Sequence, residues 1–264
     1  MMKYKELNKK LWDTLTDIHA NSQFYDLEAF KKGKSTLKSV EREELGDVTN
    51  KTLLHLQCHF GLDSLSLARK GAIVTAIDYS DRSIQMAKKL SKELNVPAEF
   101  ICSNIYDLPN NLQKKFDIVF TSYGVLHWLP DLEEWAKIVK QFLKPDGIFY
   151  IVEIHPILNM FNTTGTKRTF PYFHNKKPMA IKKGSCINPE SNFISTYYEW
   201  AHSISDIINS LIKAGLILDY FHEFPFMVFN KLPYLKESKP GQYVIDSKDE
   251  FTLPLMYSIK AHNV

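Results

Sequence analysis

The chain has 264 residues, of which 44% are hydrophobic and 24% are charged, the balance of an ordinary soluble globular protein. Its formal charge of +3 gives no argument for binding to nucleic acid or to a membrane surface. The charged first residues lack the apolar core of a signal peptide, and no run approaches the roughly 18 apolar residues of a membrane span. We therefore expect a protein without membrane segments, built as one large α/β domain or as a domain with an insertion.

The three cysteines, Cys58, Cys102 and Cys186, are odd in number and form no CxxC pair. This usage is typical of reduced thiols, so we expect a cytoplasmic protein. No group of histidines, cysteines and carboxylates has the spacing of metal ligands, and we predict no metal site.

The first fifty residues precede any βαβ pattern. Apolar residues recur there at helical spacing, at Tyr4, Leu7, Leu11, Trp12, Leu15 and Ile18. A looser stretch with Tyr25, Phe30 and Gly33 follows, and then a short charged helix around 39–45. We predict that residues 1–50 form a helical cap over a domain that starts near Lys51.

From residue 51 the pattern alternates regularly between strands and helices. Strands are predicted at 52–57, 72–78, 98–102, 116–122 and 147–154. Helices are predicted at 62–70, 81–94 and 132–143, with a short one near 109–114. Runs such as Ile148–Val152 are apolar throughout, as strands covered on both faces are. This half of the chain predicts a parallel, doubly wound sheet.

After Pro156 the alternation stops. Residues 156–200 hold turn formers, scattered aromatic residues and six basic residues, Lys167, Arg168, Lys176, Lys177, Lys182 and Lys183. Because insertions in such folds decorate the ligand end of the sheet, we predict that this segment is a substrate lid. The basic and aromatic residues suit an anionic or aromatic substrate, or RNA, although a solvated surface is the commoner meaning of such a run.

The C-terminal part restores regular structure. A helix is predicted to open at Ser203 and to run to Lys213, with Gly215 as its terminator, followed by strands at 216–221 and 251–261. A polar stretch, 228–250, separates the two strands. We expect them to form a hairpin-like pair at one side of the sheet.

A nucleoside site is predicted where the first two strands end. The turn from Gln57 to Gly61 has one glycine, whereas a dinucleotide loop needs small residues at three positions for its pyrophosphate. Asp78 ends the next strand, where a carboxylate can accept hydrogen bonds from both ribose hydroxyls. The alternative is that Asp78 only caps the following helix. A nucleoside without phosphate, S-adenosylmethionine, is the ligand that remains.

Five motifs follow one another in an order that resembles a class I S-adenosylmethionine-dependent methyltransferase, most closely the bacterial small-molecule branch. They are LHLQCHFGLD at 54–63, AIDYS at 76–80, FDIVF at 116–120, LHWL at 126–129 and LKPDG at 143–147. The resemblance covers about residues 50–156. It implies a Rossmann-like sheet of seven strands, mostly parallel with an antiparallel last strand, and S-adenosylmethionine as the cofactor.

The resemblance also implies a set of cofactor-binding residues. They are Gln57, Cys58, Phe60, Gly61, Asp78, Tyr79, Asn104, Ile105 and Ser122. The sequence departs from the family pattern at three positions: His55 stands where the family has an acid, and Gln57 and His59 stand where it has glycines. Gln57 or Asp63 is then left to bind the ammonium of the cofactor. Asn104 is expected at the adenine edge, and Ile105 on the adenine ring or in the core.

Methyl transfer from a sulfonium is an in-line displacement that needs alignment and exclusion of water more than acid–base groups. The resemblance places the transferable methyl at the loop 121–128. We predict His127 as a general base and Tyr123 as a residue that shapes the pocket or binds substrate. For both, packing is the alternative. Glu153 and His155 either orient the substrate or cap the chain where it leaves the sheet.

The sequence therefore predicts methyl transfer to an oxygen or nitrogen of a small molecule, by a monomer or homodimer that binds neither nucleic acid nor membranes. Two alternatives stay open. One is an RNA or protein methyltransferase that uses the basic insertion, and the other is a non-catalytic module that binds S-adenosylmethionine. A nicotinamide dehydrogenase is the least favoured, because its phosphate loop is missing.

Overall fold

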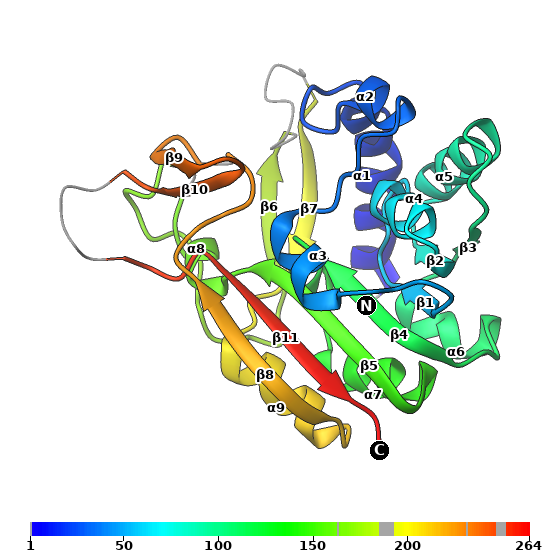
Figure 1. The fold of residues 1–264 in the computed structure, drawn as a ribbon. Coiled ribbons are helices and arrows are strands. Elements are labelled where there is room, and N and C mark those ends of the chain that lie inside the picture. Colours follow the sequence, from blue (N-terminus) through cyan, green and yellow to red (C-terminus); the bar gives the residue numbers. More distant parts are fainter. Residues whose placement is uncertain (1, 163, 185–192, 231, 247–251) are drawn as a thin grey trace.

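The computed structural model describes residues 2–162, 164–184, 193–230, 232–246 and 252–264. Its centre is a seven-stranded sheet (Figure 1). In spatial order the strands are β3 (Glu99–Cys102), β2 (Ile73–Asp78), β1 (Thr52–His55), β4 (Phe116–Ser122), β5 (Leu143–Ile154), β11 (Met256–His262) and β8 (Ile217–Phe224). The strand order reverses between β1 and β4, which places the predicted nucleoside loop at the switch point.

One strand runs against the others. β11 pairs antiparallel with β5 on one side and with β8 on the other, whereas the pairs from β3 to β5 are parallel. The predicted sheet of seven strands with an antiparallel last strand is confirmed.

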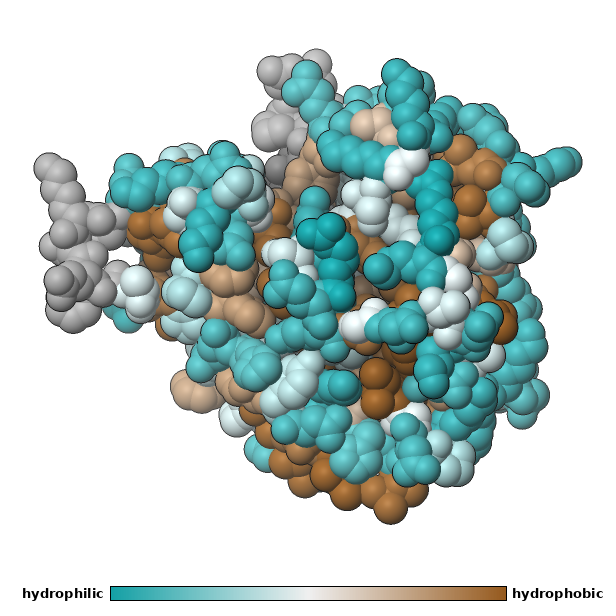
Figure 2. All heavy atoms as spheres, viewed as in Figure 1, coloured by the Kyte–Doolittle hydropathy of each residue, from teal (hydrophilic) through white to brown (hydrophobic). Residues whose placement is uncertain are grey.

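The sheet separates two hydrophobic cores, because successive residues of a strand face opposite sides. Leu53 lies in one core and Leu54 in the other. The first core includes residues of α3 (Ser39–Leu45), α4 (Leu62–Arg69) and α5 (Asp81–Glu93). The second includes residues of α6 (Leu108–Asn111), α7 (Leu132–Phe142) and α9 (Ile204–Lys213). In Figure 1, α3 lies in front of the sheet, with α7 and α9 behind it. Figure 2 shows brown, hydrophobic residues along the lower edge of the molecule. Ile217, at the start of β8, is 49% exposed.

Side-chain caps explain where several helices begin. The hydroxyl of Ser80 accepts the backbone N–H of Ser83 at the start of α5, and Ser203 forms a capping box with Asp206 at the start of α9. The short helix predicted near 109–114 instead lies at Leu108–Asn111, directly after a 3-10 turn, η1 (Ile105–Asp107). It begins early because Pro109 fits the first helical turn, and Asn104 caps the turn before it.

The structure contains two hairpins that the sequence did not predict. Inside the insertion, β6 (Met179–Lys183) pairs with β7 (Ser195–Glu199), and inside the stretch read as polar, β9 (Leu235–Lys239) pairs with β10 (Gln242–Ile245). Both lie outside the main sheet and are rich in charged residues, so hydrophobic alternation is weak (Figure 1). The last strand begins at Met256, later than predicted; residue 251 and Cys186 lie outside the described residues.

The N-terminal helix α1 (Met2–Ala20) is attached to the domain by polar contacts. Lys9 bridges Asp13 on its own helix and Asp81 at the start of α5, with N–O distances of 3.0 and 2.6 Å. The Asn8 side chain donates to the Tyr198 carbonyl and accepts the Tyr198 N–H, which ties α1 to β7. The chain also contains two short helices, α2 (Leu27–Lys31) and α8 (Pro156–Asn159). Among the described helices, none is long and apolar enough to cross a membrane.

Candidate functional site

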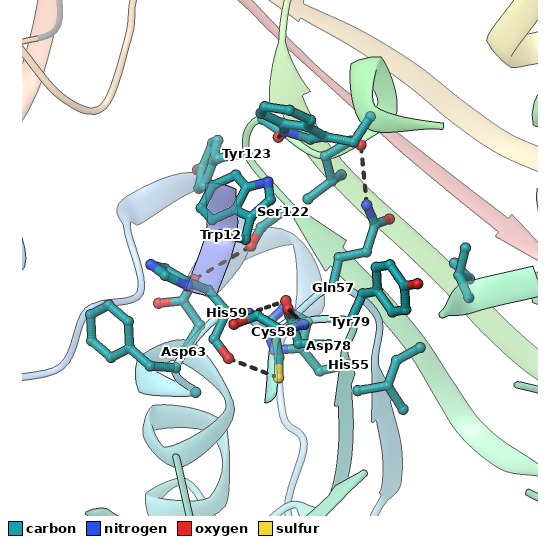
Figure 3. A pocket seen from close by; sticks show the side chains of 18 of the residues that line it. Trp12, His55, Gln57, Cys58, His59, Asp63, Asp78, Tyr79, Ser122 and Tyr123 are labelled. Atoms are coloured by element: carbon teal, nitrogen blue, oxygen red, sulfur yellow. Dashed lines mark hydrogen bonds between the residues drawn. The ribbon is translucent and has the colours of Figure 1, made fainter. Parts of the chain in front are cut away.

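A cavity of about 370 Å³ opens at the carboxyl ends of β1, β2, β3 and β4, within the size range of small-molecule sites (Figure 3). We call it the central cavity. Its walls come from the loops after these strands, from α1 and the segment that follows it, and from the chain around Phe229. The predicted site residues that line it are Gln57, Cys58, Phe60, Gly61, Asp78, Tyr79, Asn104, Ile105, Ser122 and Tyr123. The structure thus brings together all the predicted cofactor-binding residues and Tyr123, whereas His127, Glu153 and His155 do not line this cavity.

The loop after β1 keeps the backbone of a glycine-rich turn with one glycine. Gln57, His59 and Gly61 have φ angles of 55°, 51° and 82°, in the left-handed region that glycine adopts without strain. At Gly61 a Cβ atom would lie 2.7 Å from Cε1 of Phe100, so a side chain does not fit. At the other two positions the side chains are accommodated, and each has its own contacts.

The side chain of His59, in the loop after β1, contacts the N-terminal helix α1. Its Nε2 lies 3.1 Å from Nδ1 of His19, and its Nδ1 lies 3.1 Å from the Ser83 hydroxyl. Its ring also packs edge-on against Trp12, with centroids 5.1 Å apart. Burial, and then the neighbouring His19, lower the pKa of His59 well below its usual value, so the ring is neutral at neutral pH.

Asp78 lies at the end of β2 and faces the loop after β1. Its Oδ2 accepts the His59 N–H and its Oδ1 accepts the Ser80 N–H, both at 2.8 Å. Burial raises the pKa of this carboxyl to about 6, and the two N–H donors act against that rise. A carboxylate has about four acceptor positions, so two backbone hydrogen bonds leave room for two hydroxyl donors. The capping contact to Ser80 and a ribose contact are therefore compatible.

Gln57 carries an oxygen without a partner. Its Nε2 donates to the Val125 carbonyl at 3.1 Å, whereas its Oε1 is buried and accepts no hydrogen bond from the described residues (Figure 3). Asp63, on the first turn of α4, also lines the cavity. The Asp63 carboxylate accepts from the Thr36 hydroxyl at 2.5 Å and from Ser122 at 3.4 Å. Both residues line the central cavity and carry acceptor oxygens.

His55, where the family pattern has an acid, carries no charge. The ring is 3% exposed, and its Nδ1 lies 2.8 Å from the Ser64 hydroxyl. Burial lowers the pKa of His55 to about 4, so the imidazole is neutral at neutral pH. Of the residues 55 to 63, Asp63 is therefore the one that supplies a carboxylate to this loop.

The remaining predicted binding residues divide into polar and apolar contacts. Asn104 lines the cavity, and its Oδ1 accepts the Tyr106 N–H at 3.0 Å, so its amide N–H groups are the donors that remain for a ligand. Ile105 and Phe60 are buried at 4% and 1% exposure, as core residues that also form cavity wall. Cys58 is buried as a free thiol whose pKa burial raises, and Tyr79 donates its hydroxyl to Glu6 at 3.2 Å.

The two predicted catalytic residues lie in different places. Tyr123 follows β4, lines the central cavity and donates its hydroxyl to Oε2 of Glu41 at 2.6 Å. His127 lines a smaller neighbouring cavity, where its Nε2 lies 3.6 Å from Oε1 of Glu199. Its predicted role as a base stays a prediction, and so does that of Tyr123.

Glu153 and His155 have capping roles in the structure. The Glu153 carboxylate accepts the backbone N–H groups of Gly124 and Val125, and so orders the loop that carries Tyr123. The His155 ring accepts the Ile157 N–H at the start of α8 and lies 3.0 Å from Glu223. Of the two alternatives for this pair, the geometry supports capping.

Several cavity residues were not predicted as site residues: Trp12, Phe24, Tyr25, Thr36, Lys38, Phe229 and Asn230. The first five lie in the predicted cap, residues 1–50. In the sequence, the aromatic residues of this segment, which lies outside the βαβ repeat, were the feature that could have indicated a role at the site. For Phe229 the sequence offered none. Among the described residues of the predicted lid, 156–200, only Trp200 lines the central cavity.

Comparison with known proteins identifies the fold and its family. Residues 54–151 match the family model of a methyltransferase domain. The chain is 27% identical over 165 residues to the ubiquinone biosynthesis O-methyltransferase of Pasteurella multocida, a match over 59% of this chain and 64% of that enzyme. The chain therefore contains a methyltransferase domain, and it spans less than two thirds of the length of that relative.

Two solved structures show the same fold at low identity. A methyltransferase from Mesorhizobium loti is 17% identical with a TM-score of 0.55, and the match covers 85% of this chain and 96% of that one. The geranyl diphosphate C-methyltransferase of Streptomyces coelicolor, solved with S-adenosyl-L-homocysteine, is 14% identical with a TM-score of 0.53 and covers 85% and 77%. The first of these proteins is described as S-adenosylmethionine dependent, and the second was solved with the product of that cofactor bound.

The residues that line the central cavity fit S-adenosylmethionine. The unpartnered Oε1 of Gln57 and the Asp63 carboxylate are acceptors suited to an ammonium group. Asp78 retains acceptor positions for ribose hydroxyls.

Proposed function

We propose that the protein transfers a methyl group from S-adenosylmethionine to an oxygen or nitrogen of a small molecule. The observation that carries the proposal is the continuity of the central cavity. The same cavity holds Asp78 and Gln57 on one side and the aromatic side chains of Tyr123 and Phe229 on another. A cofactor and a small acceptor can therefore meet in one continuous cavity, next to the loop where the family resemblance expects the methyl group.

The cofactor contacts form the first part of the proposal. Asp78 accepts the ribose hydroxyls, Asn104 donates to the adenine edge, and Ile105 packs on the adenine ring. Gln57 and Asp63 accept the ammonium of the amino-acid part. Cys58, Phe60, Gly61, Tyr79 and Ser122 complete the wall by packing and backbone contacts. The acid that the family pattern has at position 55 is thereby replaced by Asp63, eight residues later, on the first turn of α4.

The bound cofactor supplies an electrophilic methyl group on a positively charged sulfur. The protein's own task is to hold the acceptor in line with that group and to exclude water. Trp12, Trp128 and Trp200 serve the second task, because their large rings close the cavity from α1, from the loop after β4 and from the end of the insertion. Tyr123 is placed to contact the acceptor.

A small acceptor fits the site better than RNA. The basic residues of the insertion whose side chains are described, Lys167, Arg168, Lys176, Lys177 and Lys182, are exposed, and none of them lines the central cavity. The Pasteurella relative is named as an O-methyltransferase of ubiquinone biosynthesis, which supports an oxygen acceptor in this chain too. The lid role of residues 156–200, the cap role of 1–50 and a cytoplasmic location are parts of the same proposal.

Calorimetric titration with S-adenosylmethionine and S-adenosylhomocysteine tests the first half of the proposal. We expect micromolar dissociation constants, and no detectable binding to the wild type would contradict it. A panel of phenols, catechols and amines, scored by formation of S-adenosylhomocysteine, tests the second half. Tight cofactor binding with no product from any acceptor would favour a non-catalytic binding module, and salt-dependent binding of RNA with methylation of that RNA would favour a nucleic-acid substrate.

A further inference from the structure

A buried carboxylate from the N-terminal segment reaches the reactive side of the central cavity. Glu41 lies on α3, is 1% exposed, and accepts the hydroxyl of Tyr123 with an O–O distance of 2.6 Å. Its other oxygen accepts the backbone N–H of Lys38. Because Tyr123 lines the cavity and Glu41 does not, Tyr123 stands between the acceptor and Glu41.

No cation compensates this carboxylate among the described residues, where Glu41 forms no ion pair with a lysine, arginine or histidine. The groups that face it are Tyr123, Tyr150 on β5 and the carboxylate of Asp63 on α4, with Glu44 one turn along its own helix. Burial and then Asp63 raise the pKa of Glu41 to about 7. A carboxyl group that titrates near neutral pH can both accept and release a proton under working conditions.

The same helix carries a matched pair that is directed away from the site. Glu44 accepts the hydroxyl of Tyr150 at 2.7 Å, also from a strand of the main sheet. Glu44 also lies 2.8 Å from Nδ1 of His222, and Tyr150 does not line the central cavity. The Glu44–Tyr150 pair thus ties α3 to the sheet outside the central cavity, whereas the Glu41–Tyr123 pair reaches the cavity wall.

The wall next to Tyr123 is aromatic. Phe229 packs edge-on against Tyr123 with centroids 4.9 Å apart, and Phe24 packs against Phe229 at 5.9 Å. Phe24 is nevertheless 46% exposed, which places it at the mouth of the cavity. A planar aromatic ring bound here would displace water and pack against the faces and edges of these side chains. The hydroxyl of such a ring can hydrogen-bond to Tyr123.

We propose that the methyl acceptor is a phenolic hydroxyl and that Tyr123 passes its proton to Glu41, which makes Glu41 a positioning and proton-accepting residue acting through Tyr123. The proposal rests on the proposed function. As the acceptor oxygen forms its bond to the methyl carbon, the carbon–sulfur bond breaks and its electron pair stays on the sulfur. The phenol proton moves to the Tyr123 oxygen, the Tyr123 proton moves to Oε2 of Glu41, and Glu41 returns a proton to water before the next turnover.

The kinetic test compares Glu41→Gln and Tyr123→Phe with the matched controls Glu44→Gln and Tyr150→Phe, using a phenol from the acceptor panel and saturating cofactor. In the wild type and both controls we expect kcat to fall as the pH drops below about 7. Glu41→Gln should lower kcat by about 10²-fold with KM within a few-fold, and should remove this limb of the pH profile. Tyr123→Phe should do the same, and the double variant should lose little more.

An infrared titration without cofactor or acceptor supplies an independent measurement. A carbonyl band of a protonated carboxyl group should titrate near pH 7 in the wild type, shift in Tyr123→Phe and disappear in Glu41→Gln, but stay in both controls. If Glu41→Gln keeps the kcat and the pH profile of the wild type, the inference is overturned, but the proposed function still stands. Absence of product from the wild type with every acceptor would overturn both.

Discussion

The imidazole of His59 in the cofactor loop lies 3.1 Å from the imidazole of His19 in the N-terminal helix, Nε2 to Nδ1. The family pattern has a glycine at position 59, so the side chain there is an addition that links the loop to α1. Ser83 completes the link, since its hydroxyl lies 3.1 Å from His59 and 2.6 Å from the Thr16 hydroxyl. A residue that departs from the cofactor motif thus fastens a wall of the cavity.

His59→Asn tests this link. Asparagine tolerates the left-handed backbone but is too short to reach His19, so the loop should keep its shape while α1 loosens. We expect faster amide hydrogen exchange in residues 2–20 and a stability loss of about 1–2 kcal/mol. Affinity for S-adenosylmethionine should fall several-fold, because Trp12 on α1 forms cavity wall. His174→Asn, at an exposed position, should leave all three unchanged. Uniformly faster exchange throughout the sheet would contradict a local link.

The Gln57 oxygen leads to a second prediction, which uses two ligands. Gln57→Leu removes the unpartnered acceptor from the cavity, so we expect affinity for S-adenosylmethionine to fall about tenfold. Affinity for 5′-methylthioadenosine, which lacks the amino-acid part, should stay within twofold. Asp63→Asn should show the same selective loss. Equal losses for both ligands would mean that Gln57 shapes the loop and does not bind the ammonium.

Much of the fold was predictable, because it follows from patterns local in the sequence. Leu53 and Leu54 are both apolar since the strand is covered on both faces, and Asp78 was placed by counting from Gly61. The role of His59 was not, because its partner His19 is 40 residues away and is brought near only by the packing of α1. Phe229 likewise reaches the cavity through tertiary packing. The β9–β10 hairpin has mostly exposed or half-buried residues and leaves no periodic signal.

Asp78→Asn supplies the counterpart to the Gln57 prediction. Asp78 is proposed to hold the ribose, which both ligands share, so affinity for S-adenosylmethionine and for 5′-methylthioadenosine should fall together, by about 10- to 100-fold. Because the pKa of this carboxyl is raised to about 6, the wild type should also lose affinity for both ligands as the pH drops below 6. In Asp78→Asn this pH dependence should be absent. Selective loss for one ligand would contradict ribose binding.

His55 predicts how stability depends on pH. Its pKa is about 4 in the folded protein, below its usual value, so in acid the unfolded chain binds a proton that the folded protein does not. The contribution of the neutral, buried ring is complete above about pH 6.5 and is lost as the pH falls toward 4. We expect the free energy of unfolding of His55→Asn to vary less steeply over this range, by up to about 1.4 kcal/mol per pH unit. Urea unfolding of the wild type and of His55→Asn at pH 4.5 to 7 measures this dependence. If the unfolding free energy changes equally with pH in both proteins, a group other than His55 titrates.

Variants of His127 and Glu153 distinguish a role in the chemical step from a role in ordering the loop that carries Tyr123. His127 lies outside the wall of the central cavity and beside Glu199, which favours packing, the alternative that the sequence left open for it. We therefore expect His127→Ala to retain kcat within about threefold, with an unchanged pH profile. Glu153→Ala leaves the N–H groups of Gly124 and Val125 without their acceptor, and so should lower kcat by tenfold or more and destabilise the fold by about 2 kcal/mol. Because Glu153 touches the loop and not the cavity, its loss should disturb Tyr123 at every pH alike. A 100-fold loss in His127→Ala with a flattened acid limb would instead restore His127 as the base and displace Glu41 from that role.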